Sequence, residues 1–457
     1  MNRKSGYLLV TTLMLGSALL SACGSGGNEK NASSASPSAA AGSTQAAASE
    51  SASPSAAQED TTPVTIKYAS WMSKGEDKPM LEAFMKKYPY ITVEDTVLDG
   101  AQYDKLLKTK IISGDAPDVF LFMKAAQYAS YVQEGWLMDV TDEPGTARLK
   151  ESQPLADYYS VDGKIYGSMV NGGVEYFPVY YNKKYFAKLG IQPPTTPEEL
   201  YTISEKIKAD GKDPFVFGGK DGWPFRIFFD PYRNAEDFGS YPTYNDSLYK
   251  GEVKPSDLYK NTFAEFEKWV KAGYVGKASL TMSYDQSVQY FADGKAGMIP
   301  QGPWLTGLDP IKNAKDLELG AFAYPYAPVN GKIQVLAAAD RSIGISAKTK
   351  HADAAKKLYN FFLEQANITE YLNSQGLTTL LPGLDLTIDP ALVDFMKVVG
   401  DTGKIEPHFN AGSVSFPPAW DSVTWASYQN ILAGQPVADE LKRVDAEFAK
   451  IKDQAVK

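Results

Sequence analysis

The chain has 457 residues, a formal net charge of −9 at pH 7 and 12% aromatic residues. It carries no basic stripe, which argues against nucleic acid as a partner. Its single cysteine, Cys23, excludes an intrachain disulfide and a cysteine-based zinc site.

The first residues have the pattern of a secretory signal. Arg3 and Lys4 form a short basic region, which an apolar stretch over residues 7–20 follows. That stretch is shorter than the about 20 residues of a membrane span and fits the apolar core of an export signal. Leu-Ser-Ala-Cys at residues 20–23 resembles a bacterial lipobox. We expect residues 1–22 to be a signal peptide and Cys23 to be lipidated; an ordinary signal with an incidental cysteine is the alternative.

The segment after the cysteine is built from small and polar residues. Residues 24–62 contain no aromatic and no large aliphatic side chain. Such a segment cannot bury enough apolar surface to offset its ordering entropy, so we predict that residues 23–62 are a lipidated cysteine and a disordered tether, with a glycosylated stalk as the alternative. The resemblance to bacterial lipoproteins implies a diacylglycerol anchor. We expect the protein at the outer face of the bacterial cell membrane, in a Gram-positive envelope, touching the membrane through its lipid only.

The rest of the chain alternates between strand-like and helix-like segments. Residues 64–68 show the period-two pattern of a strand, and residues 80–88 carry apolar side chains at helical spacing. A second strand begins at Ile91. Residues 119–122 form a short continuous apolar run, typical of a buried parallel strand. The alternation predicts an α/β fold, with enough residues for two domains.

Several helix ends are marked by capping residues. Asn182 is predicted to cap a helix that Gly190 ends. The sequence Thr-Pro-Glu-Glu at residues 196–199 has the pattern of a capping box with proline at the first helical position, and this helix should run to about Gly211. Further helices are predicted over residues 351–363 and 437–451.

Five short segments, in this order, resemble motifs of the family 1 extracellular solute-binding proteins, the group that includes maltose-binding protein. The most similar segment reads Phe-Ala-Asp-Gly-Lys-Ala-Gly-Met at residues 291–298, then Gln-Gly-Pro-Trp at residues 301–304. The others are a Gly-x-Ala-Pro-Asp-Val step, a Tyr-Asn-Lys helix start, an Ile-Gly-Ile-Ser strand and an Ala-Gly-Gln-Pro turn, at residues 114–119, 181–183, 343–346 and 433–436.

The resemblance implies a two-lobe α/β fold of the periplasmic-binding-protein type II, with lobes joined by hinge strands. Crossings between the lobes are expected near residues 169–175, 336–343 and 380–384. The N-lobe would comprise residues 63–170 plus 341–382, and the C-lobe residues 171–338 plus 385–457. The implied function is capture of a mono- or oligosaccharide between the lobes, followed by delivery to the permease subunits of an ABC transporter. Ligand contacts from both lobes would favour the closed form over the open one.

A sugar site needs flat aromatic surfaces for the C–H faces of the rings and fixed polar groups for the hydroxyls. Ligands of open α/β sheets bind beyond the carboxyl ends of strands. Aromatic side chains at strand ends and in turn-rich loops are therefore the candidate platforms, against the alternative that each packs in a core: Trp71, Phe122, Trp223, Trp304 and Trp420. Trp269 and Trp425 fall on predicted helices and are assigned structural roles.

Five polar residues are candidates for the sugar hydroxyls. Gln301 belongs to the motif of the Gln-Gly-Pro-Trp segment, and Asp221 is in the loop before Trp223. Glu175 is in register with a sugar-contacting glutamate of the maltose-binding relatives. Asp340 and Arg341 lie at the second crossing, where an ion pair that braces the hinge is the alternative. Residues 123–126 read Met-Lys-Ala-Ala where the maltose-type relative has an aspartate–arginine pair, which argues against maltose itself.

Two other classes of function remain as alternatives. A carbohydrate-active enzyme could use paired carboxylates, but the two histidines, His351 and His408, have no serine or cysteine partner in view, so we expect no catalytic residue. The same fold could bind a polyamine between Trp71, Trp223 and Asp221. We expect no cofactor and no metal, with a structural calcium near Asn245 left open, and we expect a monomer.

Overall fold

The computed structural model describes residues 61–455 except for residues 73–74, 175–176, 237–242, 326–332, 400–404, 409–413, 415 and 418. Contacts divide the chain into Met1–Asp60 and Thr61–Lys457, and the second unit contains every described element. The predicted signal peptide, Cys23 and nearly all of the tether fall outside the described residues, as does Glu175.

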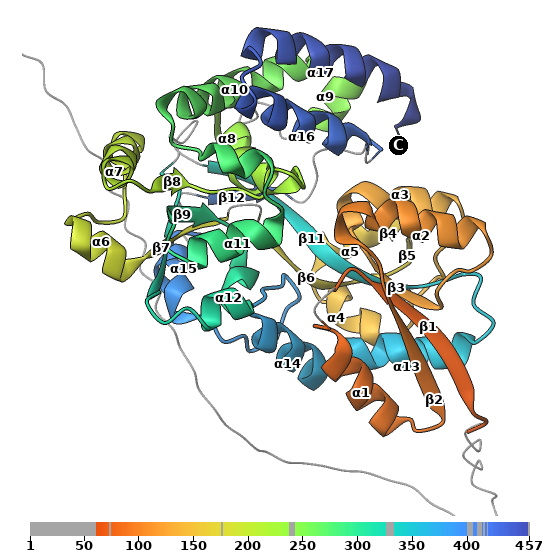
Figure 1. The fold of residues 1–457 in the computed structure, drawn as a ribbon. Helices are drawn as coiled ribbons and strands as arrows, with labels where there is room; N and C mark the ends of the chain where they lie inside the picture. Colours follow the sequence, from red (N-terminus) through yellow and green to blue (C-terminus); the bar gives the residue numbers. More distant parts are fainter. Residues whose placement is uncertain are drawn as a thin grey trace, which may run out of the picture. The chain divides into compact units, whose positions relative to one another are not determined.

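The first of two large sheets has six strands in the order β12-β11-β3-β1-β2, with β6 paired to β11. Strands β1, β2 and β3 are parallel, whereas β11 runs antiparallel to both β3 and β6. Figure 1 shows α1 and α13 on one side of these strands and α2 and α3 on the other. The strands are β1 (Val64–Ser70), β2 (Ile91–Val97), β3 (Val119–Phe122), β6 (Ser168–Val174), β11 (Ile333–Ile345) and β12 (Ile405–His408).

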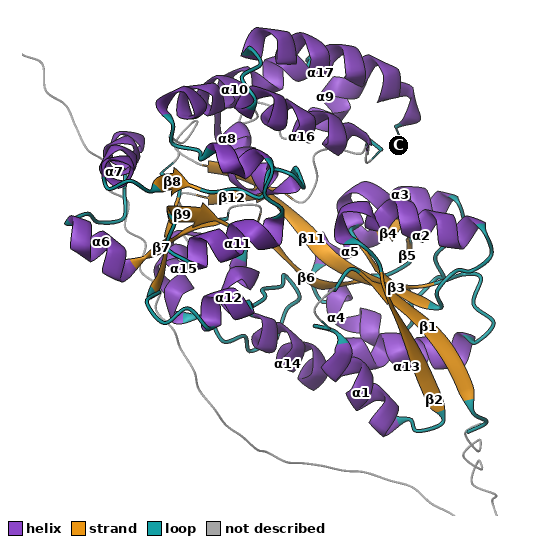
Figure 2. Cartoon of the chain, viewed as in Figure 1, coloured by secondary structure: helices purple, strands orange, loops and turns teal. Residues whose placement is uncertain are grey.

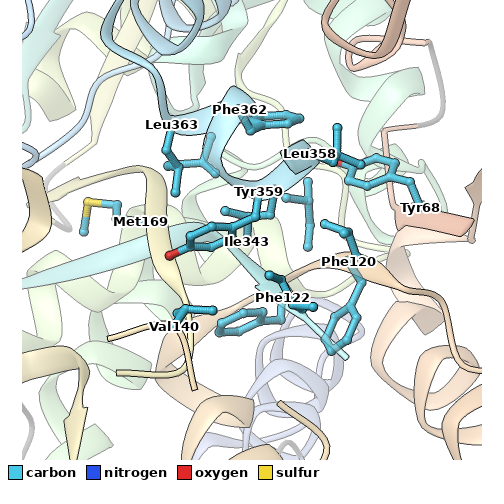
Figure 3. Close-up of a cluster of buried hydrophobic side chains, with 14 of the residues drawn as sticks. Tyr68, Phe120, Phe122, Val140, Met169, Ile343, Leu358, Tyr359, Phe362 and Leu363 are labelled. Carbon is cyan, nitrogen blue, oxygen red and sulfur yellow. The ribbon is translucent and has the colours of Figure 1, made fainter. Parts of the chain in front are cut away.

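The helices around this sheet bury their apolar faces in one cluster, the first core, which runs in sequence from Ile66 to Leu381. Figure 3 shows its centre, where Phe362 of α13 pairs with Tyr68 of β1, whereas Phe120 and Phe122 of β3 contact Tyr131 and Tyr128 of α3. The contributing helices are α1 (Lys78–Lys87), α2 (Tyr103–Ile112), α3 (Lys124–Gln133), α4 (Ala147–Lys150), α5 (Gln153–Tyr159), α13 (Ala352–Leu363) and α14 (Gln365–Gln375), and a small hairpin of β4 (Ser160–Val161) and β5 (Lys164–Ile165) follows α5.

The second sheet has four strands in the order β10-β7-β9-β8 and two further cores. Its strands are β7 (Pro178–Asn182), β8 (Asp213–Phe215), β9 (Ala296–Pro300) and β10 (Leu319–Ala323). The second core is rich in aromatic rings, with Trp269 fully buried beside Phe215 and Phe228. The helices of these cores are α6 (Lys183–Leu189), α7 (Pro197–Ala209), α8 (Trp223–Glu236), α9 (Tyr244–Lys250), α10 (Pro255–Ala272), α11 (Tyr284–Ala292), α12 (Asp309–Lys312), α15 (Val393–Val399), α16 (Ala419–Leu432) and α17 (Val437–Ile451).

The caps predicted for the helices are present. The Asn182 side chain accepts from the Lys184 backbone N–H at 3.0 Å, and Gly190 ends α6 in the left-handed conformation. Thr196 caps α7 by accepting from the Glu199 N–H at 3.2 Å, with proline at the first position. A capping box predicts that the Glu199 carboxylate accepts from the Thr196 backbone N–H. In the structure it accepts instead from the backbone N–H and the hydroxyl of Thr195, one residue earlier. Each cap satisfies a backbone N–H that the first helical turn leaves unpaired.

Strand β11 joins the two halves of the molecule. Its first residues pair with β12, residues 337–343 pair with β6, and its last residues pair with β3. Figure 2 shows β6 and β11 running side by side between the two groups of helices. The pairing shifts register on both sides of Arg341, which marks a bulge in the strand. Two of the three predicted crossings therefore coincide with strands that pair with each other.

Asp118, the residue directly before β3, has a structural role. Its two carboxylate oxygens accept from the Lys67 backbone N–H of β1 at 2.8 Å and from the Thr349 hydroxyl. Its own carbonyl accepts from the Ser346 N–H at 2.9 Å. One buried side chain thus fastens β1 to the turn that follows β11.

No described helix combines the length and the apolar character needed to cross a membrane.

We predict that Asp118→Ala lowers the free energy of unfolding by about 1–3 kcal/mol, because it leaves buried hydrogen-bonding groups unpaired. Asp115, three residues earlier, is the matched control. It is 48% exposed, and hydrogen bonds from Lys110 and Lys67 lower its pKa to about 2. Asp115→Ala removes only exposed ion pairs and should cost less than about 1 kcal/mol. Urea unfolding of the two variants measures the difference; equal losses would contradict the role given to Asp118.

Candidate functional site

Four aromatic side chains form a row on the second half of the molecule. The Trp223 and Tyr284 ring centroids are 5.0 Å apart, and those of Trp304 and Phe177 are 6.1 Å apart. The Trp304 side chain lies close enough to the Tyr284 hydroxyl to lower its pKa, so the two pairs are near each other. All four side chains are half-buried. We call Phe177, Trp304, Tyr284 and Trp223 the aromatic row.

The row is assembled from the ends of four different elements. Trp223 is the first residue of α8, and Tyr284 is the first residue of α11. Phe177 directly precedes β7, and Trp304 lies in the short helix η4 (Pro303–Gly307) that follows β9. Side chains at such ends are free of the packing that strand and helix interiors impose, and they lie where open α/β sheets bind ligands.

Trp304 spans the two halves of the molecule. It follows β9 of the second sheet, yet it packs against the first core. Its ring lies against the backbone of Gly302, where any Cβ atom would overlap it. Nearby, a Cβ on Gly307 would lie 2.8 Å from the Gln375 carbonyl oxygen, so η4 approaches the end of α14 closely. The two glycines are therefore required by close approach.

Polar side chains of the hinge strands lie in the same region. Asn171 of β6 donates to Asp340 of β11 at 3.1 Å. Arg341 donates instead to the Tyr371 hydroxyl at 2.9 Å and to Gln375 at 3.0 Å, both on α14. Asp340 and Arg341 thus brace the hinge through different partners.

The Arg341 bonds continue into a buried network. The Tyr371 hydroxyl donates a hydrogen bond to the Asp77 carboxylate at 2.6 Å, and the Tyr68 hydroxyl donates to the same carboxylate at 2.9 Å. Burial works to lower the pKa of Arg341, but Tyr371, Asp340 and Asp77 hold that pKa above its ordinary value. The guanidinium therefore stays charged, and the network ties the loop before α1 to β11 and α14.

Four buried polar atoms of this region have no hydrogen-bond partner among the described residues. They are both side-chain polar atoms of Gln301, the Asn171 Oδ1 and the Arg341 Nε. The three side chains are between 0 and 8% exposed. An unpaired buried polar atom costs about 1–3 kcal/mol, and folded proteins have few of them. Asn171 and Arg341 lie on the paired strands β6 and β11 and Gln301 follows β9, so a ligand that reached these positions could pair these atoms.

The Tyr284 hydroxyl lies within electrostatic reach of several charged residues. Burial raises the pKa of Tyr284, and the nearby Trp304 side chain lowers it. Arg341 lowers the same pKa and Glu76 raises it, so both charges act on this hydroxyl. Tyr284 belongs to α11 of the second half, whereas Glu76 precedes α1 of the first. Charges from both halves therefore act on the pKa of this hydroxyl, together with that of the neighbouring Asp285.

Of the residues that the sequence suggested, Trp223 and Trp304 belong to the aromatic row, Gln301 lies three residues before Trp304, and Asp340 and Arg341 are neighbours in β11. Asp221 lies beside the aromatic row, but one oxygen of its carboxylate already accepts from the Tyr284 backbone N–H at 2.7 Å. Trp71 lies on the first half, half-buried, with its ring 4.8 Å from that of Tyr103.

Phe122 and Trp420 lie in cores instead of the aromatic row. Phe122 has no exposed surface and stacks on Tyr128 at 5.7 Å, because β3 is covered by helices on both faces (Figure 3). Trp420 is 8% exposed and packs against Phe448 at 5.0 Å in the second core. Trp420 therefore does not converge with Trp223 and Trp304.

Four residues of this region were not predicted from the sequence: Phe177, Tyr284, Asn171 and Tyr371. Tyr284 had a detectable signal, since Ser283 and Gln286 form a capping box around it and so place it at an exposed helix start. Asn171 falls within the crossing predicted near residues 169–175, but no local pattern indicated a role for its side chain. Tyr371 lies on a helix whose position against β11 depends on contacts distant in sequence.

Comparisons with known proteins agree on the family. The family model described as bacterial extracellular solute-binding protein matches residues 64–368. The chain is 28% identical over 336 residues to the multiple sugar-binding protein of Streptococcus mutans, covering 72% of this chain and 77% of that protein. It is 25% identical to an uncharacterised ABC transporter extracellular-binding protein of Pyrococcus horikoshii, covering 81% of this chain and 84% of that one.

Solved structures show the fold. A chitin oligosaccharide binding protein superposes with a TM-score of 0.74 at 22% identity, covering 86% of this chain and 99% of its own. The protein RafE in complex with raffinose gives 0.69 at 21% identity, covering 85% of this chain and all of its own. A Bacillus licheniformis sugar transporter in complex with stachyose gives 0.68, at the same identity and coverage. With this two-lobe α/β fold of the periplasmic-binding-protein type II, and with a family match across two thirds of its length, the chain belongs to the bacterial extracellular solute-binding proteins.

Proposed function

We propose that this protein binds a carbohydrate between its two lobes and delivers it to the permease of an ABC transporter, acting as a binding protein and not as an enzyme. The observation that carries the proposal is the aromatic row beside the buried, unpaired amide of Gln301. The names of relatives support the same ligand class: one is a multiple sugar-binding protein, and two structural neighbours hold raffinose and stachyose.

The chemistry of the row suits a sugar. Indole and phenol rings offer flat apolar faces to the C–H groups of a pyranose, at a low cost in side-chain entropy. Gln301 and Asn171 carry amides, which both donate and accept, as a hydroxyl does. The charged groups Arg341 and Asp340 are already paired with protein partners. This composition favours an uncharged, hydroxyl-rich ligand over a polyamine, which would need free carboxylates.

Lobe closure follows from where these groups lie. Trp304 and Tyr284 come from the second half, whereas Arg341 and Glu76 come from the hinge and the first half. A ligand that contacts both sets has higher affinity for the closed form and shifts the population towards it. The proposed lobes are residues 63–170 plus 341–382 and residues 171–338 plus 385–457, with β6 and β11 as hinge strands.

We further propose that residues 1–22 are removed as a signal peptide and that Cys23 carries the lipid that holds the protein at the outer face of a Gram-positive cell membrane. Residues 23–62 would then act as a tether, and the protein would work as a monomer. Two unrelated features support this part of the proposal: the lipobox-like sequence, and the absence of large apolar residues between the cysteine and the first strand.

We predict that a neutral sugar from a panel of mono- and oligosaccharides raises the melting temperature, because a ligand at a hundred times its Kd adds about 2.7 kcal/mol to stability. Small-angle scattering with the same sugar should show a smaller radius of gyration. Putrescine and spermidine serve as non-sugar controls. Stabilisation by a polyamine alone would overturn the ligand class, cleavage of the sugar would overturn the non-enzymatic assignment, and binding without compaction would overturn closure.

We predict that Gly302→Ala displaces the Trp304 ring, costs about 1–3 kcal/mol of stability and weakens sugar binding. In a protein that already carries Trp304→Ala, adding Gly302→Ala should cost less than about 1 kcal/mol relative to Trp304→Ala alone, because the overlapping ring is gone. Gly100→Ala is the control, since a Cβ there meets only the Trp71 Cβ, at 3.8 Å. Unfolding curves and titration calorimetry measure both effects. An additive double mutant would show that the ring is not what Gly302 accommodates.

A further inference from the structure

The seven tryptophans differ in what they pack against. Trp269 and Trp420 are buried in the second core. Trp71, Trp136 and Trp304 are half-buried and pack against the first core. Trp223 and Trp425 are also half-buried, but neither belongs to any of the three core clusters formed by the described residues. Two large indoles thus remain without the packing that explains the other five.

These two tryptophans lie close together although about 200 residues separate them. A Cβ built on Gly222 would lie 2.9 Å from the Cβ of Trp425, so Trp425 of α16 packs directly on the residue before Trp223. Gly222 has a φ of +79°, a conformation that other residues rarely adopt. Glycine is therefore needed twice at this position, for the turn and for the approach of the indole.

The loop that carries Trp223 is fixed in place by side-chain bonds. Gln429, one turn after Trp425 on α16, donates to the Gly219 carbonyl at 2.7 Å. From the other side, Asp221 accepts from the Tyr284 backbone N–H at 2.7 Å. These contacts hold Trp425, the loop and Tyr284 in a set arrangement, so the relative positions of their rings are built into the fold.

Trp425 also has an unused hydrogen-bonding group. Its indole Nε1 is buried and has no hydrogen-bond partner among the described residues. An indole nitrogen is a donor only, and buried indoles usually find an acceptor. A hydroxyl oxygen of a bound molecule would supply one. Trp425 therefore places a second indole, with an unpaired N–H, against the loop that carries Trp223.

We propose that Trp223 and Trp425 form an outer platform, distinct from the Trp304 platform at the hinge, and that the ligand is an oligosaccharide long enough to reach both. Trp425 then determines chain-length preference. This inference rests on the proposed carbohydrate function. A single sugar ring covers one aromatic platform, and the Phe177–Trp304 and Trp223–Tyr284 pairs are already two separate ring pairs. Each further ring of the ligand would add contact at the Trp425 end.

The test measures affinity along a ladder of sugars that differ by one ring, such as sucrose, raffinose and stachyose, or chitooligosaccharides of increasing length. For the wild-type protein, calorimetry should show affinity rising with length. Trp425→Ala should weaken binding of the longest tight ligand by roughly tenfold or more and leave the shortest binder unchanged. Trp425→Phe, which keeps a ring but lacks the N–H, should lose less.

Matched measurements keep the test decisive. Trp136→Phe alters a half-buried tryptophan that packs on Tyr131 and the first core, so it should change no affinity. If Trp425→Ala does not fold, the indole N–H proton resonance of Trp425 in the wild-type protein is the second readout, and only the longer ligands should shift it. Equal losses for all lengths, or no loss, would overturn the outer platform. If the wild-type protein binds only monosaccharides, the outer platform is overturned but the proposed carbohydrate-binding function stands. If it binds no sugar, the outer platform and the proposed function are both overturned.

Discussion

The antiparallel pairing of β11 with β6 is the constraint on which the rest of the site depends. A single strand of 13 residues serves three neighbours in turn, so the two halves of the molecule share backbone hydrogen bonds and not only side-chain contacts. The bulge at Arg341 sends adjacent side chains to different partners, with Asp340 bound to β6 and Arg341 bound to α14. Because this connection is made of paired strands, backbone hydrogen bonds as well as side chains fix its register.

The aromatic row uses this frame in a specific way. Trp304 leaves the second sheet and packs on the first core, and the absence of a side chain at Gly302 makes room for its ring. The neighbouring unpaired atoms of Gln301, Asn171 and Arg341 would be costly in a protein selected for stability alone. A site that keeps polar groups unsatisfied beside flat rings gives up stability in order to discriminate among ligands.

Much of the scaffold was predictable because its signals are local. The continuous apolar run at residues 119–122 indicated a strand buried on both faces, and the caps at Asn182 and Thr196 placed two helix starts. The same local reasoning gave mixed results for the site. Phe122 is at a strand end, but helices on both faces of β3 enclose its ring.

Trp425 is a residue whose packing could not be predicted from the local sequence. Its position on a helix suggested a structural role, and only the contact with Gly222, distant in sequence, reveals that it packs on a loop and not on a core. Tyr284 likewise became visible only when α11 was placed against the loop before Trp223. Local patterns specify the elements, whereas the partners of a side chain at an element's end depend on the assembled topology.

The first core has a consequence for how the molecule is made. Its members run from Ile66 to Leu381; strand β11 is an inner strand of the sheet that contains β1, and helix α13 packs on that sheet. A chain emerging from its N-terminus therefore has no complete first domain to fold until more than 300 residues have followed β1. The usual order, in which an N-terminal domain folds during synthesis, does not apply to such an interrupted domain. The first core can therefore be completed only after strand β11 and helices α13 and α14 have been synthesised, and its many contacts between distant residues are of the kind that form slowly.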